Sequence, residues 1–368
     1  MAVLPPDDEL RKRLAGFREI LARERLSGFL VTDPRNVRYL SGFTGDDSAL
    51  LVTARHRLLL TDFRYLAEAR ATAPGWAVRT RPPELLAKAG HFARKLRVRK
   101  LGLESEHLTL NMLKSLRKAV GGMRLKPTAG LVGHLRLSKS PWEIRQIEKA
   151  LRIQEACFRR VCRLLKPGLR EDEAAAEMRH ALVRAGASDE SFPSLFQWGP
   201  GSSWPHGRPT ARRLRDDSLV LVDWGAKVAG YHSDLTRAFF IGKIPKRLRE
   251  IHAVVAEAQA RAKARVGPGV AFAEVDKAAR SFIRKAGFGK YFGHSTGHGL
   301  GLCVHEAPRL SSRAQGELQP GMVMTIEPGI YLPGVGGVRL EDDVLVTEKG
   351  HRVLSRAPMG LRWNGGNE

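Results

Sequence analysis

The sequence predicts an α/β N-terminal domain with a mixed sheet over residues 1–135 and an α+β C-terminal domain with an internal repeat over residues 136–368. The first part alternates short apolar runs with amphipathic stretches, which is typical of an α/β domain. The second part repeats a long helix, a Pro-Gly turn, a second helix and strands. A length of 368 residues agrees with two domains, because one domain commonly holds roughly 100–200 residues.

The elements of the first domain follow from apolar runs bounded by turn residues. An amphipathic run begins at Phe63, and helical segments lie between and after the strands. Strands are expected at 29–32, 49–53, 58–61, 76–80 and 101–103. Proline and glycines weaken every periodic pattern at 126–139, so the domain boundary is expected there.

The second domain begins with a well-marked helix start. Ser140 suits the N-cap, Pro141 the first helical position, and Glu143 completes a capping box for a helix over 141–165. These signals place the start of a new domain immediately after the boundary region.

A repeat with an offset of about 101 residues organises this domain. KPGL at 166–169 precedes a helix that ends at 185–186, and GPGV at 267–270 precedes a helix that ends at 286–287. Long helices are expected before these turns, over 141–165 and 246–265. Two similar halves that face each other are therefore predicted, unless the Pro-Gly turns recur by chance.

The composition is that of an ordinary globular chain, with 43% hydrophobic and 27% charged residues, which excludes a fibrous or largely disordered protein. The three cysteines (Cys157, Cys162 and Cys303) form no CxxC pair, so neither a disulfide framework nor a thiolate zinc site is expected. We expect all three to be small buried hydrophobic residues in a reducing compartment. No signal-like segment or long apolar run occurs, which predicts a cytoplasmic protein without a membrane span.

The formal net charge of +24 is unusual, with +14 in residues 1–140 and +10 in the remainder. Such a charge raises the question of a polyanionic partner. However, the basic residues are dispersed among acids apart from short runs such as 94–100, and no aromatic-studded basic strand accompanies them. We therefore expect a solvated basic surface and no nucleic-acid partner. The alternative is a basic adaptor without enzymatic activity that binds nucleic acid or protein.

Two aspartates suggest the first half of a charged site. Residues 218–240 read as a β-hairpin, and a two-residue turn centred on Val228 and Ala229 would place Asp223 opposite Asp234. The alternative is a pair of surface carboxylates, but Asp223 interrupts an apolar run, where an unpaired charge is costly. The pair therefore indicates a metal site or an acid–base site.

The second repeat supplies another acidic pair. A hairpin centred on Gly334 places Glu327 opposite Glu341. Four carboxylates that converge between two equivalent hairpins would bind two divalent cations, because oxygen ligands suit such ions. Asp342 and Asp343 continue the acidic run, and we expect a rim or structural function for them.

Histidines and glycines alternate at 292–306. His294 and His298 are spaced i, i+4, but Gly297 and the glycines that follow argue against a helix. A loop that leads into a glycine-rich strand is expected, where missing side chains allow a ligand to approach the backbone. Spacing alone leaves open whether His294, His298 or His305 is a ligand or an ordinary core or surface residue.

The motifs DWGAKVAGYHSDLTR, HSTGHGLGLCVHE, MTIEPGIY and GVRLEDD resemble those of the "pita-bread" metallopeptidases over about 140–350. NVRYLSGFTG and LLLTDFRY resemble the creatinase-like N-terminal domain of the Xaa-Pro branch of that family. The resemblance implies a creatinase-like domain followed by a pita-bread catalytic domain. It also implies five ligands of a dinuclear metal centre: Asp223, Asp234, His298, Glu327 and Glu341.

The resemblance also implies catalytic roles. His206 and His305 occupy positions where the Xaa-Pro enzymes keep histidines beside the scissile peptide, and Arg339 resembles an arginine kept near the second metal. We expect Glu327 to shuttle a proton, while the metals activate a water. Position 303 is more often an acidic residue in this family, so the cysteine found here bears on substrate preference.

The implied function is hydrolysis of the Xaa-Pro bond at peptide N-termini, as in aminopeptidase P, with an Xaa-Pro dipeptidase (prolidase) as the alternative. The resemblance alone implies a proline-containing peptide or dipeptide as the substrate. A shaped pocket would suit it, because the proline ring fixes φ and the bond before it has no N–H. Two divalent ions are implied, most readily Mn, with Co, Fe or Zn also tolerated. The resemblance further implies a homodimer.

Overall fold

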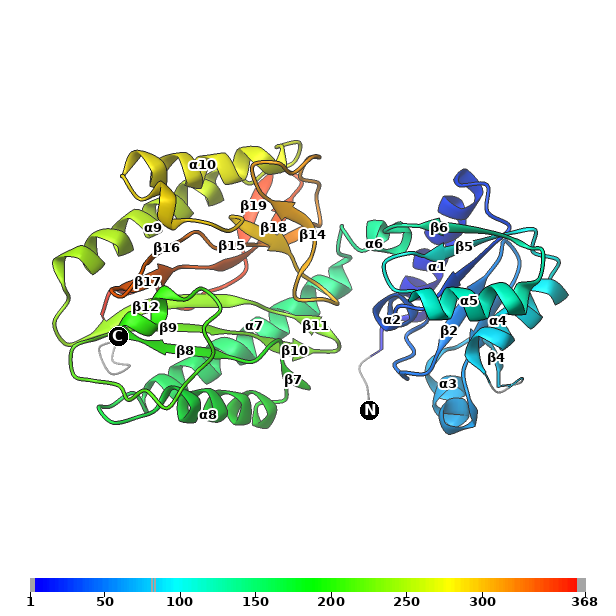
Figure 1. Ribbon diagram of the computed structural model, residues 1–368, viewed down its shortest axis with the longest axis horizontal. Helices are drawn as coiled ribbons and strands as arrows, with labels where there is room; N and C mark the ends of the chain where they lie inside the picture. Colours follow the sequence, from blue (N-terminus) through cyan, green and yellow to red (C-terminus); the bar gives the residue numbers. More distant parts are fainter. Residues whose placement is uncertain (1–3, 81, 83, 363–368) are drawn as a thin grey trace. The chain divides into compact units, whose positions relative to one another are not determined.

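The computed structural model describes residues 4–80, 82 and 84–362 (Figure 1). The chain divides into two compact units, Met1–Arg136 and Leu137–Glu368. None of the helices in the described ranges combines enough length with enough apolar character to cross a bilayer.

The N-terminal unit contains a six-stranded mixed sheet of order β4-β3-β2-β1-β5-β6. Its strands are β1 (Gly28–Val31), β2 (Ala49–Val52), β3 (Arg57–Leu60), β4 (Ala77–Arg79), β5 (Lys100–Glu104) and β6 (Arg124–Thr128). The β1–β2 and β2–β3 pairs are antiparallel, and the other pairs are parallel. The predicted mixed sheet is therefore confirmed.

Strand β6 was not expected, because Pro127 and the following glycine predict a break in this segment. In the structure β6 pairs in parallel with β5 and forms the edge of the sheet. A proline lacks the N–H that an inner strand would need, but an edge strand tolerates it. The break in regular structure is therefore limited at this point to residues 129–130, before a short helix begins at Leu131.

Helices cover both faces of this sheet. They are α1 (Asp7–Arg23), α2 (Pro34–Ser41), α3 (Leu66–Thr72), α4 (Leu85–Lys95), α5 (Leu110–Val120) and α6 (Leu131–Leu135), with a 3₁₀ turn at Phe63–Tyr65. Leu30 of β1 packs in one apolar cluster with Ala89 of α4 and Leu116 of α5. Its neighbour Phe29 points to the opposite face and meets Phe17 of α1 edge-on, with ring centroids 5.3 Å apart.

The C-terminal unit is built from two helix pairs that flank its strands (Figure 1). The helices are α7 (Pro141–Cys162), α8 (Glu171–Arg184), α9 (Lys246–Arg265) and α10 (Phe272–Lys285). The predicted Ser140 capping box is present at the start of α7. Because α8 and α10 start and end at positions 101 residues apart, the structure confirms the predicted repeat.

Matching glycines fix the ends of the repeated helices. Gly168 and Gly269 precede α8 and α10, Gly186 and Gly287 follow them, and all four have positive φ. Glycine adopts this left-handed conformation without the strain that a Cβ imposes. The backbone conformation at these glycines therefore repeats with the same offset of 101 residues as the sequence does.

The strands of this unit form several small sheets. They are β7 (Asp189–Glu190), β8 (Leu195–Trp198), β9 (Ser218–Trp224), β10 (Ala226–Val228), β11 (Tyr231–His232), β12 (Leu235–Ile241), β13 (Gly297–Gly299), β14 (Glu306–Leu310), β15 (Val323–Ile326), β16 (Gly329–Leu332), β17 (Gly336–Arg339), β18 (Asp342–Thr347) and β19 (Gly350–Val353). Short 3₁₀ turns lie at Gly199–Ser203 and Gly289–Tyr291.

The register of the first hairpin differs from the prediction. Asp223 of β9 lies opposite Thr236 of β12, so the predicted opposition of Asp223 and Asp234 is wrong. The turn is centred on Ala229 and Gly230, one residue later than expected. Both residues have positive φ, 49° and 80°, as a type I′ turn requires, and Gly230 supplies the position that prefers glycine.

The register of the second hairpin confirms the prediction. Gly329 pairs with Arg339 in β16 and β17, and Ile326 pairs with Asp342 in β15 and β18. The same strand register therefore holds on both sides of Glu327 and Glu341, as the predicted opposition of these two residues requires.

The cysteines are free, and the structure corrects one expectation about them. Cys157 and Cys162 are buried in α7, as predicted. Cys303 is only half-buried, because it lies in the loop between β13 and β14 rather than on a core-facing element.

Candidate active site

A pocket of about 750 Å³ in the C-terminal unit contains every residue predicted for the site. These lining residues are His206, Asp223, Asp234, His298, His305, Glu327, Arg339 and Glu341. They come from β9, β13, the break between β11 and β12, the ends of β15 and β17, and two loops, so both repeats contribute to the pocket.

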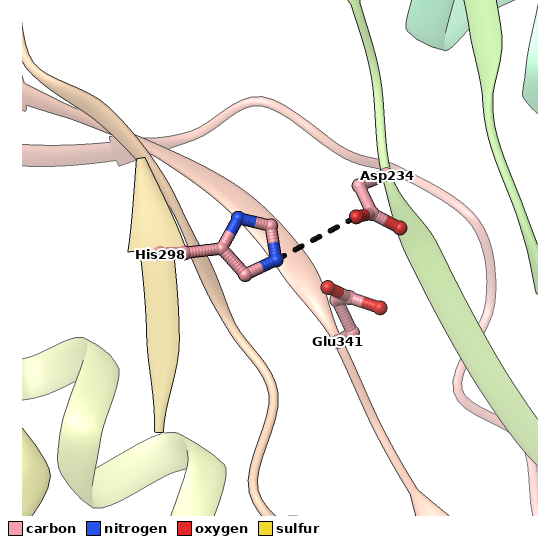
Figure 2. A group of neighbouring side chains, drawn as sticks. All are labelled: Asp234, His298 and Glu341. Atoms are coloured by element: carbon pink, nitrogen blue, oxygen red, sulfur yellow. Dashed lines mark ion pairs between the residues drawn. The ribbon is translucent and has the colours of Figure 1, made fainter. Parts of the chain in front are cut away.

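Three side chains converge at the centre of this pocket (Figure 2). The potential ligand atoms of Asp234, His298 and Glu341 all lie within 4.8 Å of one another. His298 Nε2 is 3.8 Å from Asp234 Oδ2 and 3.3 Å from Glu327 Oε1. One imidazole and several carboxylate oxygens thus share a space of the size of a cation site.

The glycines around His298 allow its strand to pack closely. A Cβ at Gly297 would overlap with the carbonyl oxygen of Thr325, and a Cβ at Gly299 would overlap with that of Ala307. The predicted glycine-rich strand is therefore confirmed as β13, and its glycines meet backbone on both sides.

The Thr325 hydroxyl links this strand to the next acidic group. It accepts a hydrogen bond from the backbone N–H of His298 at 3.1 Å and donates to Glu327 Oε1 at 3.2 Å. A single hydroxyl therefore orients two of the converging residues.

Backbone and side-chain contacts join the two repeats at the site. The N–H of Asp234 donates to Asp343 Oδ2 at 3.2 Å. Thr236 donates through its hydroxyl to Glu341 Oε2 at 2.6 Å, while its carbonyl accepts from the Glu341 N–H at 3.1 Å. The loop that carries Glu341 is thus held directly against β12.

Arg339 fixes the fourth carboxylate. Its Nη2 donates to Asp223 Oδ2 at 2.6 Å, its Nε donates to Thr236 Oγ1 at 2.9 Å, and its Nη1 donates to the Tyr331 hydroxyl at 2.9 Å. Asp223 Oδ1 is buried and has no hydrogen-bond partner among the described residues. A buried carboxylate oxygen that lacks a partner lines the pocket, where a cation would satisfy it.

The remaining histidines lie at different depths. His305 and His206 are exposed at the pocket, and the His305 ring centroid is 4.3 Å from that of His298. His294 is held inside, with Nδ1 2.8 Å from the Ser295 carbonyl and Nε2 3.0 Å from the Tyr331 hydroxyl.

Sequence reasoning missed two kinds of pocket residue. The Tyr331 hydroxyl contacts both His294 and Arg339. The position of this tyrosine in an apolar strand could have predicted such polar partners, because a buried hydroxyl needs them. The exposed cations Arg208 and Arg309 also line the pocket, but nothing in their sequence context distinguishes them from the many other arginines.

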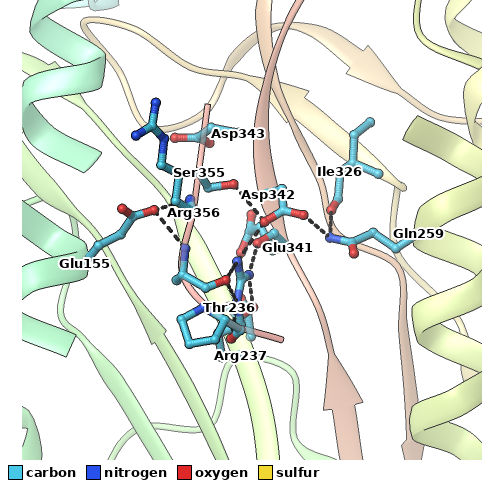
Figure 3. Close-up of polar contacts among 12 residues, drawn as sticks. Glu155, Thr236, Arg237, Gln259, Ile326, Glu341, Asp342, Asp343, Ser355 and Arg356 are labelled. Atoms are coloured by element: carbon cyan, nitrogen blue, oxygen red, sulfur yellow. Dashed lines mark hydrogen bonds and ion pairs between the residues drawn. The ribbon is translucent and has the colours of Figure 1, made fainter. Parts of the chain in front are cut away.

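Asp342 and Asp343 lie in the interior behind the site, so the expected structural role fits them and a rim position does not (Figure 3). Asp342 accepts from Arg237 Nη2 at 2.8 Å and from Lys263 Nζ at 2.7 Å. Arg237 also donates to the backbone carbonyl of Ala357, which ties down the C-terminal segment. These ion pairs hold the start of β18, directly after Glu341, in place.

Comparison with known proteins decides the family. The model of metallopeptidase family M24 matches residues 145–348, which is more than half of the chain. The model of the creatinase/prolidase N-terminal domain matches residues 13–138. The chain belongs to metallopeptidase family M24.

Relatives of this M24 metallopeptidase match it over nearly its whole length. An Xaa-Pro dipeptidase from Pyrococcus horikoshii is 32% identical over 358 residues, which cover 96% of this chain and 99% of the relative. The structure of an Xaa-Pro dipeptidase from Bacillus anthracis is 35% identical, with a TM-score of 0.93 and coverage of 96% and 99%. The structure of an X-Pro aminopeptidase from Thermotoga maritima is 32% identical, with a TM-score of 0.85 and coverage of 92% and 99%.

These likenesses establish the predicted architecture, a creatinase-like N-terminal domain followed by a pita-bread catalytic domain. They also favour a peptidase over the non-enzymatic adaptor considered from the charge.

The electrostatics of the pocket fit the divalent ions that a metallopeptidase uses. Burial, and then the neighbouring carboxylates Glu341 and Asp223, raise the pKa of Asp234 well above its usual range. Burial likewise raises the pKa of Glu341 and of Glu327. Burial lowers the pKa of His298, which favours the neutral imidazole that a metal requires. Bound divalent cations would place positive charge beside these carboxylates and so keep them ionised.

Proposed function

We propose that this M24 metallopeptidase cleaves the bond before proline in short peptides and acts first of all as an Xaa-Pro dipeptidase. The convergence of Asp234, His298 and Glu341 in a pocket is the observation that carries the hydrolase proposal. Two of the three relatives described above are Xaa-Pro dipeptidases, which places the dipeptidase ahead of the aminopeptidase P-like activity expected from the sequence. The aminopeptidase remains the second candidate because of the Thermotoga maritima relative.

The proposed metal ligands are Asp223, Asp234, His298, Glu327 and Glu341. Divalent cations bound there would polarise the peptide carbonyl and lower the pKa of a water toward neutrality. The oxygen-rich donor set suits manganese, which we propose as the metal, with cobalt, iron or zinc as replacements.

The chain's own residues would position the substrate and move the proton. Glu327, beside the converging ligands, is the proposed proton carrier. His206 and His305 lie exposed at the pocket and would donate to the carbonyl oxygen as negative charge develops on it. Arg339 holds Asp223 and is a positioning residue rather than a catalytic one.

Two arginine side chains in the pocket support a dipeptide as the substrate. Arg208 and Arg309 line the pocket and are exposed, and neither makes an ion pair with another described residue. A dipeptide carries its C-terminal carboxylate directly on the proline, and a guanidinium binds a carboxylate with two parallel hydrogen bonds. We propose that Arg309 recognises this carboxylate.

The hydrolase proposal is tested with Asp223→Asn and Glu327→Gln. Both proteins are stripped of metal, reloaded with manganese and assayed on an Xaa-Pro dipeptide. A loss of at least about a hundredfold in kcat is expected for each variant. Wild-type turnover at full metal content would overturn the proposed roles.

The dipeptidase is distinguished from the aminopeptidase by comparing an Xaa-Pro dipeptide, its C-terminal amide and an Xaa-Pro-Yaa tripeptide. We expect kcat/KM to be highest for the free dipeptide. Arg309→Leu should lower kcat/KM about tenfold for the free dipeptide and leave the amide unchanged. Arg313→Leu, at an exposed position outside the pocket, is the matched control. Faster cleavage of the tripeptide by the wild-type protein would favour the aminopeptidase.

Two further parts of the proposal concern assembly and location. The family resemblance supports a homodimer, which light scattering tests through a mass twice that of the 40.7 kDa chain. Three free cysteines support a reducing location in the cytoplasm, to be checked by fractionation of the source cells.

A further inference from the structure

A cluster of arginines surrounds a second pocket, which lies in the N-terminal unit. The pocket measures about 450 Å³ and is lined by Arg11, Arg18, Arg55 and Arg57, together with Leu14 and Ala15. Helix α1 supplies the first two arginines, which share one face because they are seven residues apart. The other two come from the turn between β2 and β3 and from the first residue of β3.

The described residues that line this pocket include no acidic side chain, although Asp7 lines the smaller pocket beside it. Among the described residues, none of its four guanidinium groups forms an ion pair, and Arg18 Nε donates to the backbone carbonyl of Thr53 at 3.1 Å. Elsewhere in the same unit, by contrast, Arg64 pairs with Asp62 at 2.5 Å. Burial and then the charge of Arg57 lower the pKa of Arg18, as expected where like charges crowd together.

A smaller pocket of mixed polar and apolar lining adjoins the cluster. It measures about 230 Å³ and shares Arg11 and Arg57 with the larger pocket. Its other walls are Asp7, Leu10, Leu40, Pro74, Gly75 and Trp76. A pocket lined by arginines therefore lies next to a pocket lined by Trp76.

We propose that the arginine cluster binds an anion of two or more linked phosphoryl groups. Guanidinium groups match phosphate oxygens with paired hydrogen bonds, and four of them exceed what one carboxylate would satisfy. A phosphate chain carries several negative charges, which match the several guanidinium groups around this pocket. The anion comes either from inorganic polyphosphate or from a nucleotide whose base enters the smaller pocket, which Trp76 lines. This site is separate from the peptidase pocket and does not depend on the proposed peptidase activity.

The test is calorimetric titration of the full chain with sodium tripolyphosphate and, separately, with ATP. The decisive variant is Arg11→Gln/Arg55→Gln, because both side chains are exposed and neither makes a hydrogen bond among the described residues. We expect it to weaken binding about tenfold or more. The control is Arg94→Gln/Arg117→Gln, which removes the same charge from exposed positions of the same unit outside both pockets.

Each outcome has one meaning. Tighter binding of ATP than of tripolyphosphate supports the site with a nucleotide as its ligand, and equal binding supports it with inorganic polyphosphate. Equal loss of binding in the two double variants would overturn the proposal, because it would show attraction to net charge alone. Binding of a single-stranded RNA without binding of either small phosphate would also overturn it.

Discussion

Thr236 donates a hydrogen bond to Glu341 Oε2 at 2.6 Å and accepts one from Arg339 Nε at 2.9 Å. It also lies directly opposite Asp223 in the β9–β12 pair. The hydroxyl therefore connects the first repeat, which carries Asp223, to the second, which carries Glu341. An uncharged residue with no place in the proposed ligand set thus holds Glu341 directly and Asp223 through Arg339.

Thr236→Val is predicted to lower the affinity for manganese by about 10- to 100-fold, because residues that hold metal ligands in place typically have effects of this size. The valine methyl fills the space but neither donates to Glu341 nor accepts from Arg339. Competition with a chelating dye measures the affinity, and Thr236→Ser should keep most of it. An unchanged affinity in the valine variant would refute this role.

Arg339→Lys is predicted to lower kcat/KM about a hundredfold while the chain still folds. A lysine ammonium keeps the charge beside Asp223, but it does not span Asp223, Thr236 and Tyr331 as the guanidinium fork does. Steady-state kinetics at saturating metal, with circular dichroism as a check of folding, provide the measurement. Full activity in the lysine variant would show that charge alone matters at this position.

Gly299→Ala is predicted to destabilise the C-terminal unit by about 1–3 kcal/mol and to weaken metal binding. Its methyl group would overlap with the backbone carbonyl of Ala307, which cannot move without shifting β14 and the strand that carries His298. Gly293→Ala, where the added atom meets nothing within 4 Å, is the control. Thermal unfolding with and without manganese should separate the two variants, and equal melting temperatures would contradict the prediction.

Glu104→Gln is predicted to destabilise the N-terminal unit by about 1–3 kcal/mol, because the new amide N–H group would face another donor. The buried Glu104 carboxylate accepts from the N–H groups of Thr32 and Asp33 and from Asn36 Nδ2, at 2.6–2.7 Å. A glutamine side chain has only one acceptor oxygen for these donors.

The stability difference between the wild type and this variant should depend on pH. Burial raises the pKa of Glu104 in the folded chain above the unfolded value of about 4.3. The folded state therefore binds the Glu104 proton more tightly than the unfolded state does. The stability gained from this proton binding is fully present below about pH 4.3 and is lost as pH rises through the raised pKa. Urea unfolding at several pH values, followed by pulsed hydrogen exchange over residues 28–41, should show a larger wild-type advantage at low pH. A difference that grows with pH would contradict the assignment.

The two hairpins show how far local sequence determines a site. Around Gly334 the apolar pattern and the loop glycines specified one register, and the Glu327–Glu341 relationship followed from it. In the first hairpin, Val228, Ala229 and Gly230 permit turns that differ by one residue, so the predicted partner of Asp223 was wrong. The aspartates nevertheless line the same pocket, because Asp234 lies in the break between β11 and β12 and reaches the centre from there.

Sequence patterns alone determined the two-domain architecture, the repeat, the capping of α7 and the acidic residues that line the pocket, whereas the histidines of the site were identified only through the family resemblance. These features depend on local backbone preference, on periodic burial and on residue types that are costly to bury without partners. Tertiary structure alone decided the partners of Thr236, the depth of Asp342, the role of Tyr331 and the gathering of four arginines around one pocket. Such contacts join residues that are far apart in the chain, and only the packing of whole elements fixes their distances.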